Sequence, residues 1–110
     1  MIIGFDFQDT ISAHPKVFRN LATALMPFGH TVYIISAVKK QNVSKRIEEV
    51  KRSKVPHAHL ELVVYDDYLS IPQKKLEACK RLGVKLMIDN NGDVCQLLAR
   101  HKITVFKVIE

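Results

Sequence analysis

The chain contains no tryptophan, only two cysteines, and only four residues each of glycine and proline. Cys79 and Cys95 stand alone, without a Cys-x-x-Cys pair, so their spacing favours neither a disulfide framework nor a zinc knuckle. No apolar run approaches the roughly 20 residues of a membrane-spanning helix, which argues against a membrane protein. The amino-terminal run MIIGFDF lacks the basic start and long apolar centre of a secretory signal, which predicts a cytoplasmic protein.

The composition is that of an ordinary globular domain. The 110 residues are 47% apolar and 25% charged, and no linker, repeat or low-complexity tract interrupts them. We therefore expect one domain over residues 1–110. The net charge of +6 and the pI of about 9.5 favour anionic ligands, from a phosphorylated metabolite to a nucleic-acid backbone, without choosing between them.

Short apolar runs alternate with amphipathic segments along the whole chain. Continuous apolar runs typical of buried strands occupy residues 2–5, 31–35, 60–65, 84–88 and 103–109. Apolar residues recur at helical spacing in residues 15–25, 39–54, 70–82 and 94–101. This alternation implies right-handed crossovers, so the sequence predicts an α/β fold, a three-layer sandwich around a five-stranded, mostly parallel, Rossmann-like sheet.

Four polar clusters follow the predicted strands. They are residues 6–10, Ser36, the pair Asp66 and Asp67, and residues 89–93. Ligands of open parallel sheets bind outside the carboxyl ends of the strands, so these clusters hold the candidate functional residues. Asp66 and Asp67 are more simply interpreted as caps of the helix that follows them.

The segment from Ile3 to Ile11 resembles the first motif of the haloacid dehalogenase (HAD) superfamily, in which apolar residues precede Asp-x-Asp-x-Thr. Three further positions resemble the later motifs of that family in the same order. Ser36 falls where the family has a phosphate-binding Ser or Thr, Lys75 where it has a lysine, and Asp89 where it has an acidic metal ligand. The resemblance covers the whole chain and implies a small HAD-like phosphatase domain without a cap.

The resemblance implies a nucleophile and a magnesium ion. Asp6 would attack phosphorus and form an aspartyl-phosphate, dividing one difficult hydrolysis into two displacements. Mg²⁺ would be held by Asp6, by the main-chain carbonyl of Gln8 and by Asp89, because Mg²⁺ prefers oxygen ligands in octahedral geometry. The acidic motif is either a modified Asp-Asp pair or an Asp-x-x-x-Asp form that Asp93 completes.

The resemblance also implies the groups that hold the phosphate. The hydroxyls of Thr10 and Ser36 and the ammonium of Lys75 would stabilise the phosphoryl oxygens. Lys74 is the alternative to Lys75, and the spacing of Lys75 before Asp89 suits the family motif better.

Two positions depart from the family pattern. Gln8 stands where phosphatases of the family have the aspartate that protonates the leaving group, and an amide cannot exchange that proton. We therefore expect slow turnover unless Asp9 or His14 replaces this acid. Asn90 removes one carboxylate if the acidic motif is an Asp-Asp pair, and Asp93 is then the residue that compensates.

The chain has no room for the cap that usually closes over a HAD site. Residues 8–15 form at most a short flap, and residues 66–72 form a loop. Such a site resembles those of capless members that act on macromolecules or are sealed by another subunit, as in a homo-oligomer. The basic helix expected over residues 39–54 follows Ser36 directly, so its N-terminus would border the phosphate. A nucleotide, a nucleic-acid end or a phosphoprotein is therefore the expected substrate.

Two rivals to a phosphoric monoester hydrolase remain open from the residues. One is a catalytically silent HAD-like domain that binds a phosphorylated ligand or protein partner, and Gln8 is the residue that separates it from an enzyme. The other is a receiver domain, whose phosphoacceptor would be Asp66 at the end of the third strand. The placements of Thr10 and Ser36 favour the phosphatase-like arrangement.

Overall fold

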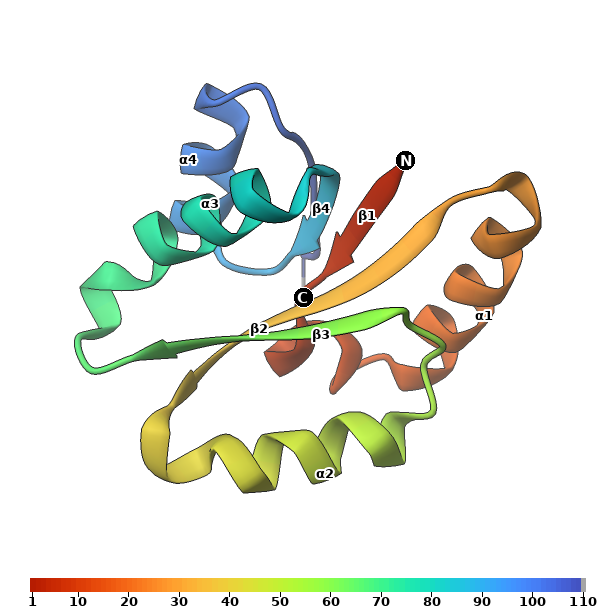
Figure 1. Cartoon of the computed structure of the whole chain (residues 1–110), viewed down its shortest axis with the longest axis horizontal. Coiled ribbons are helices and arrows are strands. Elements are labelled where there is room, and N and C mark those ends of the chain that lie inside the picture. The colour runs from red at the N-terminus through yellow and green to blue at the C-terminus, as the bar shows by residue number, and fades with distance from the viewer. Residues whose placement is uncertain (110) are drawn as a thin grey trace.

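The computed structural model describes residues 1–109 and forms one parallel sheet flanked by helices (Figure 1). The elements are β1 (Ile2–Phe5), α1 (Pro15–Leu25), β2 (Thr31–Lys39), α2 (Val43–Ser53), β3 (His59–Tyr65), α3 (Ile71–Leu82), β4 (Val84–Asp89), α4 (Gly92–Arg100) and β5 (Thr104–Lys107). The strand order is β3-β2-β1-β4-β5, and every neighbouring pair is parallel. The predicted α/β fold with a five-stranded parallel sheet is confirmed.

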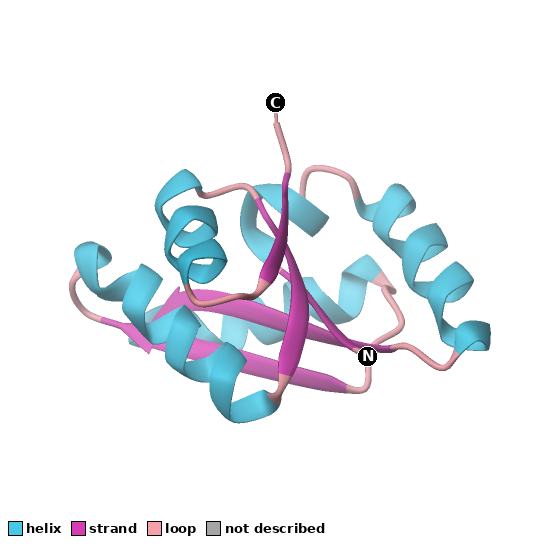
Figure 2. Ribbon diagram, turned by 90° about the horizontal axis from the view of Figure 1, so that it is seen from above, coloured by secondary structure: helices cyan, strands magenta, loops and turns pink. Residues whose placement is uncertain are grey.

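Two hydrophobic cores, one on each face of the sheet, make the molecule three-layered (Figure 2). Helices α1 and α2 cover one face, where Phe5 packs edge-on against Phe18 at 5.0 Å between ring centroids. Helices α3 and α4 cover the other face, where Met87 and Leu98 are fully buried. Both faces of the sheet are covered by apolar side chains, which explains why the sequences of the strands are continuous hydrophobic runs.

Gly4 allows the second core to press closely against β1. A Cβ at this position would lie 2.7 Å from Met87 Sδ and 3.1 Å from Ile35 Cδ1, which is closer than packed carbon and sulfur atoms approach. The glycine thus leaves room above the central strand for side chains of the neighbouring strands β2 and β4.

Strand β2 is longer than predicted, and this displaces the basic helix. The strand continues through Ser36 to Lys39 because it pairs with β3 in register, Ser36 with Leu62 and Lys39 with Tyr65. A short turn follows, and α2 begins only at Val43. The prediction that a helix over residues 39–54 starts directly after Ser36 is therefore wrong.

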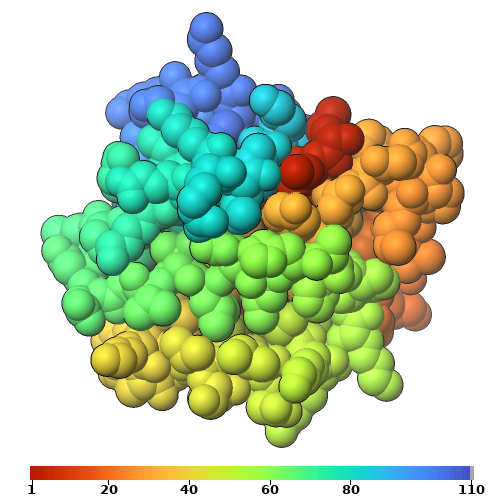
Figure 3. All heavy atoms as spheres, in the orientation of Figure 1, coloured from red at the N-terminus to blue at the C-terminus, as the bar shows by residue number. Residues whose placement is uncertain are grey.

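Strand β3 forms an edge of the sheet and lies at the surface between α2 and α3 (Figure 3). No helix within residues 1–109 is long and apolar enough to cross a membrane. Helix α4 begins two residues earlier than predicted because the Asn91 side chain accepts hydrogen bonds from the N–H groups of Asp93 and Val94.

Candidate functional site

The candidate site lies where β1 and β4 end side by side. These strands pair in parallel, with Phe5 opposite Ile88, and the Asp6 N–H donates to the Ile88 carbonyl at 2.9 Å. The order of strands along the chain reverses between β1 and β4, and such switch points are where open α/β sheets bind ligands. Asp6 and Asp89 are therefore neighbours at the ligand-binding end of the sheet.

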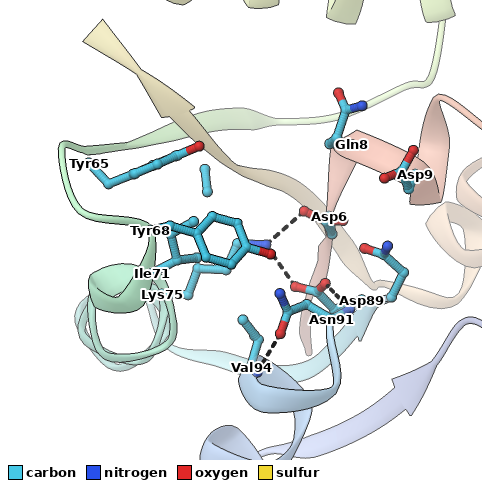
Figure 4. A pocket seen from close by; sticks show the side chains of 12 residues that line it. Asp6, Gln8, Asp9, Tyr65, Tyr68, Ile71, Lys75, Asp89, Asn91 and Val94 are labelled. Carbon is cyan, nitrogen blue, oxygen red and sulfur yellow. Dashed lines mark hydrogen bonds and ion pairs between the residues drawn. The ribbon is translucent and has the colours of Figure 1, made fainter.

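Lys75 joins these two carboxylates in a buried ion cluster (Figure 4). Its ammonium enters from α3 and lies 2.7 Å from Asp6 Oδ1 and 2.7 Å from Asp89 Oδ2. The side chains are 3%, 5% and 0% exposed for Lys75, Asp6 and Asp89. The neighbouring Lys74 lies outside the cluster, because its exposed side chain donates to the Val64 carbonyl.

The charges in this cluster do not balance. One ammonium faces two carboxylates, so the cluster carries a net negative charge when both carboxylates are ionised. Burial raises the pKa of Asp6 to about 6, and Asp89 adds to this, although Lys75 acts in the opposite direction. Burial alone would lower the pKa of Lys75, but the two carboxylates outweigh it and raise that pKa. Lys75 thus stays protonated, and the site attracts further positive charge.

Three oxygen-bearing groups beside the cluster fit a magnesium ion. One terminal atom of the Asn90 amide lies 3.0 Å from Asp6 Oδ2 and 3.2 Å from the Gln8 carbonyl oxygen. As nitrogen, this atom donates to both. As oxygen, it would stand from the Asp6 and Gln8 oxygens at close to the roughly 3 Å that separates adjacent ligands of octahedral Mg²⁺.

The remaining predicted metal ligands are placed differently. Asp89 binds Lys75 through Oδ2 and accepts the Asn91 N–H through Oδ1 at 3.0 Å. Asp93 lies in the first turn of α4, exposed, where it lines a different surface depression together with Lys107. No three His, Cys, Asp or Glu side chains within residues 1–109 form a metal-binding group. A metal here therefore depends on the Asp6 carboxylate together with carbonyl and amide oxygens.

Thr10 is buried behind the cluster and orients Asp6. The wide helical turn Phe7–Ile11, closed by a 3.0 Å hydrogen bond from the Ser12 N–H to the Phe7 carbonyl, returns the chain to Asp6. There Thr10 Oγ1 donates to Asp6 Oδ2 at 2.9 Å. The Thr10 hydroxyl is fully buried, so it fixes the carboxylate before any ligand arrives.

Arg46 is the site residue that the sequence analysis missed. Its side chain extends from α2 toward the end of β1. There Nη1 donates to Ser36 Oγ and to the Ala37 carbonyl, and Nη2 donates to Gln8 Oε1 at 3.2 Å. Its guanidinium carbon stands 5.5 Å from the centre of the Phe7 ring, and the side chain is only 11% exposed. Arg46 therefore holds both the Ser36 hydroxyl and the Gln8 side chain.

A signal for Arg46 exists in the sequence. It lies three residues after Val43 and four before Val50, on the apolar face of α2, whereas a solvated arginine belongs on the opposite face. The segment contains several other lysines and arginines, so the sequence analysis did not distinguish Arg46 from these solvated residues.

A cavity of about 130 Å³ opens onto the cluster, and we call it the site cavity. Its charged and amide-bearing side consists of Asp6, Gln8, Asp9, Lys75, Asp89, Asn90 and Asn91. Thr10 and Ser36 are completely buried and do not line it. Among the alternative acids, Asp9 lines the cavity, whereas His14 immediately precedes α1.

Comparisons with known proteins support the fold. No protein-family model matches the chain, and no curated protein matches its sequence. A chain of the Pnkp1/Rnl/Hen1 RNA repair complex matches with a TM-score of 0.76 and 12% identity, over 97% of this chain and 42% of that chain. This chain thus spans less than half the length of that one.

Two universal stress proteins have a similar structure over nearly their whole length. One, solved in complex with cAMP, has a TM-score of 0.66 and 14% identity, over 99% of this chain and 96% of that chain. The other, from Burkholderia pseudomallei, has a TM-score of 0.59 and 13% identity, over 97% of this chain and 94% of that chain. At such identities the likeness shows a parallel α/β fold and does not identify a family.

Proposed function

We propose that this chain is a capless HAD-like domain that transfers the phosphoryl group of a phosphomonoester to Asp6 and then to water. The observation that carries the proposal is the buried cluster of Asp6, Lys75 and Asp89 at the ends of β1 and β4. An ion pair exposed on the surface would not indicate a catalytic site. Asp6 is a desolvated carboxylate in a cavity, oriented by Lys75 and Thr10, and such a group is suited to attack an electrophile.

Each side chain then has a defined task. Asp6 attacks phosphorus, the bond to the leaving-group oxygen breaks, and water later cleaves the aspartyl-phosphate to release phosphate. Lys75 holds Asp6 in place and neutralises part of the charge that develops on the phosphoryl oxygens. Mg²⁺, bound by Asp6, the Gln8 carbonyl and Asn90, would reduce the repulsion between the carboxylate and the phosphate. Asp89 keeps Lys75 in position.

Turnover in this proposal is slow because no acid occupies position 8. The Gln8 amide accepts a hydrogen bond from Arg46 and cannot protonate a leaving group. General acid–base catalysis commonly contributes about 10²- to 10⁴-fold, so substrates with good leaving groups are favoured. Among the carboxylic acids on the cavity wall, Asp9 is the nearest to Gln8 in sequence, and it could protonate the leaving group instead.

The second candidate function is recognition of a phosphorylated ligand without turnover. The pairing of Gln8 with Arg46 favours it, because both side chains are fixed in a network that exchanges no proton. Two of the similar structures are described with cAMP or as part of an RNA repair complex, so a nucleotide or nucleic-acid partner is compatible with this fold.

Hydrolysis of p-nitrophenyl phosphate, with magnesium or with EDTA, tests the proposal. The native chain should release nitrophenol only with the metal, Asp6→Asn should abolish release, and Gln8→Asp should raise it. Asp93→Asn is the matched control and should retain native activity, because Asp93 lies outside the site cavity.

Inactivity of both the native chain and Gln8→Asp would contradict the enzymatic proposal. If inorganic phosphate then still binds in titration calorimetry, and Lys75→Met abolishes this binding under conditions where circular dichroism shows the variant folded, recognition is the function instead.

A further inference from the structure

The site cavity has an aromatic wall that the phosphoryl chemistry does not use. Opposite Gln8 and Asp9 stand Tyr65, at the end of β3, and Tyr68, in the turn that follows (Figure 4). Ile71 continues this wall. The cavity is thus divided between a charged floor and an apolar, ring-lined side.

The two rings differ in exposure. Tyr65 is half-buried against the core beneath α3 and α4, whereas Tyr68 is 63% exposed. The rings lie edge to face with centroids 6.4 Å apart. Tyr65 therefore buttresses Tyr68, whose own ring is left for contact with a ligand.

The turn that presents Tyr68 is held firmly. Asp67 Oδ1 accepts the Leu69 N–H at 3.0 Å, and the Asp67 carbonyl accepts both the N–H and the hydroxyl of Ser70, at 2.9 and 2.6 Å. Asp67 thus caps this short turn, whereas the sequence predicted that Asp66 and Asp67 cap α3, whose N-cap is Ser70. A fixed backbone lowers the entropy that an exposed ring loses when a ligand stacks on it.

We propose that the ligand is a nucleoside monophosphate, with its phosphate at Asp6 and Lys75 and its base stacked on Tyr68. The inference rests on the proposed function for the position of the phosphate. Each of the nucleic-acid bases is planar and has a π-face, so any of them can stack on tyrosine without specific hydrogen bonds. The ribose bridges the buried floor and the exposed rim.

A phosphate ester of an aromatic alcohol fits this geometry less well. In such an ester the ring is joined to phosphorus through a single oxygen, which keeps it close to the floor, where Lys75 is only 3% exposed. Tyr68 stands at the rim, so a ring separated from the phosphate by a sugar reaches it. The net charge of +6 also favours an anionic nucleotide.

Titration calorimetry with adenosine 5′-monophosphate and with ribose 5-phosphate tests this inference, because both ligands carry the ribose and the phosphate and only the first carries a base. Stacking contributes about 1–3 kcal/mol per base, which corresponds to a roughly 5- to 150-fold tighter dissociation constant for the nucleotide. Tyr68→Ala should remove this preference, and Tyr68→Phe should retain it. Phe28→Ala is the matched control, since Phe28 is 81% exposed but precedes β2 at the opposite end of the sheet.

Equal affinity for the two ligands, or a preference that survives Tyr68→Ala, would overturn the inference. A gain limited to phenyl phosphate over ribose 5-phosphate would also overturn it and assign the wall to aryl esters. Hydrolysis without a preference for the base contradicts only the nucleotide inference. A nucleotide preference without hydrolysis supports it and contradicts only the enzymatic part of the proposed function.

Discussion

Replacing Lys75 with methionine isolates the buried cluster, because methionine keeps an unbranched apolar side chain and removes only the ammonium. That ammonium lies 2.7 Å from both Asp6 Oδ1 and Asp89 Oδ2, and none of the three side chains is more than 5% exposed. Removing one partner of a buried ion pair costs about 3–5 kcal/mol, since the other charge loses its counter-ion. Two carboxylates lose the same partner here, so we expect a loss near 5 kcal/mol at pH 8.

The loss should shrink as the pH falls. Lys75 lowers the pKa of Asp6 in the native protein, so without it this pKa rises further and the folded protein binds a proton more tightly than the unfolded chain does. Stability of the variant then decreases as pH rises above the unfolded carboxyl pKa, and acid restores it. At pH 5 the remaining deficit should approach the roughly 1.5–3 kcal/mol of the lost charged hydrogen bonds.

Urea unfolding followed by circular dichroism, at pH 5 and pH 8 in EDTA, measures this difference. Lys80→Met is the matched control on the exposed face of α3 and should change stability by less than about 0.5 kcal/mol. Magnesium should recover part of the loss at pH 8, because a cation bound by the folded state replaces the missing charge. An equal deficit for Lys75→Met at both pH values would refute the reasoning, since protonation would then bring no relief.

Two further predictions concern the same cavity. Because burial raises the pKa of Asp6 to about 6, the folded protein keeps a proton that the unfolded chain loses near pH 4, and the carboxyl costs stability as the pH rises through that interval. In EDTA the stability of Asp6→Asn relative to the native chain should therefore increase from pH 4 to pH 6 in urea titrations, and a constant difference would contradict this. In Gln8→Asp, the guanidinium of Arg46 should hold the pKa of the new carboxyl low, since it already donates to Gln8 at 3.2 Å. Phosphatase pH profiles should show more activity at pH 7 for Gln8→Asp with Arg46→Met than for Gln8→Asp alone, whereas lower activity in the double variant would assign Arg46 a direct part in phosphate binding.

Local patterns were sufficient to predict the order of elements. The strand Ile2–Phe5 and the helix Pro15–Leu25 have the predicted bounds, because apolar continuity, helical spacing and a proline in the first turn are properties of neighbouring residues. Parallel connectivity then made the neighbourhood of Asp6 and Asp89 predictable, since two adjacent strands end at the same edge of the sheet.

Long-range pairing accounts for the errors in the elements. Strand β2 extends to Lys39 because β3 offers it hydrogen-bonding partners, and no property of residues 36–39 alone requires this extension. The start of α2 moved with it to Val43. Sequence patterns record how a residue relates to its neighbours along the chain, whereas the end of a strand depends on a partner far away.

The sequence by itself determined the fold class and the chemical types at the strand ends. Only the tertiary structure decided which side chains meet. Arg46 donates hydrogen bonds to Ser36 and Gln8. Asn90 faces Asp6 while Asp93 faces solvent, and Tyr68 borders the cavity. The physical reason is that long side chains bridge elements that are distant in sequence. Their directions follow from the packing of helices on the sheet, which no local pattern contains.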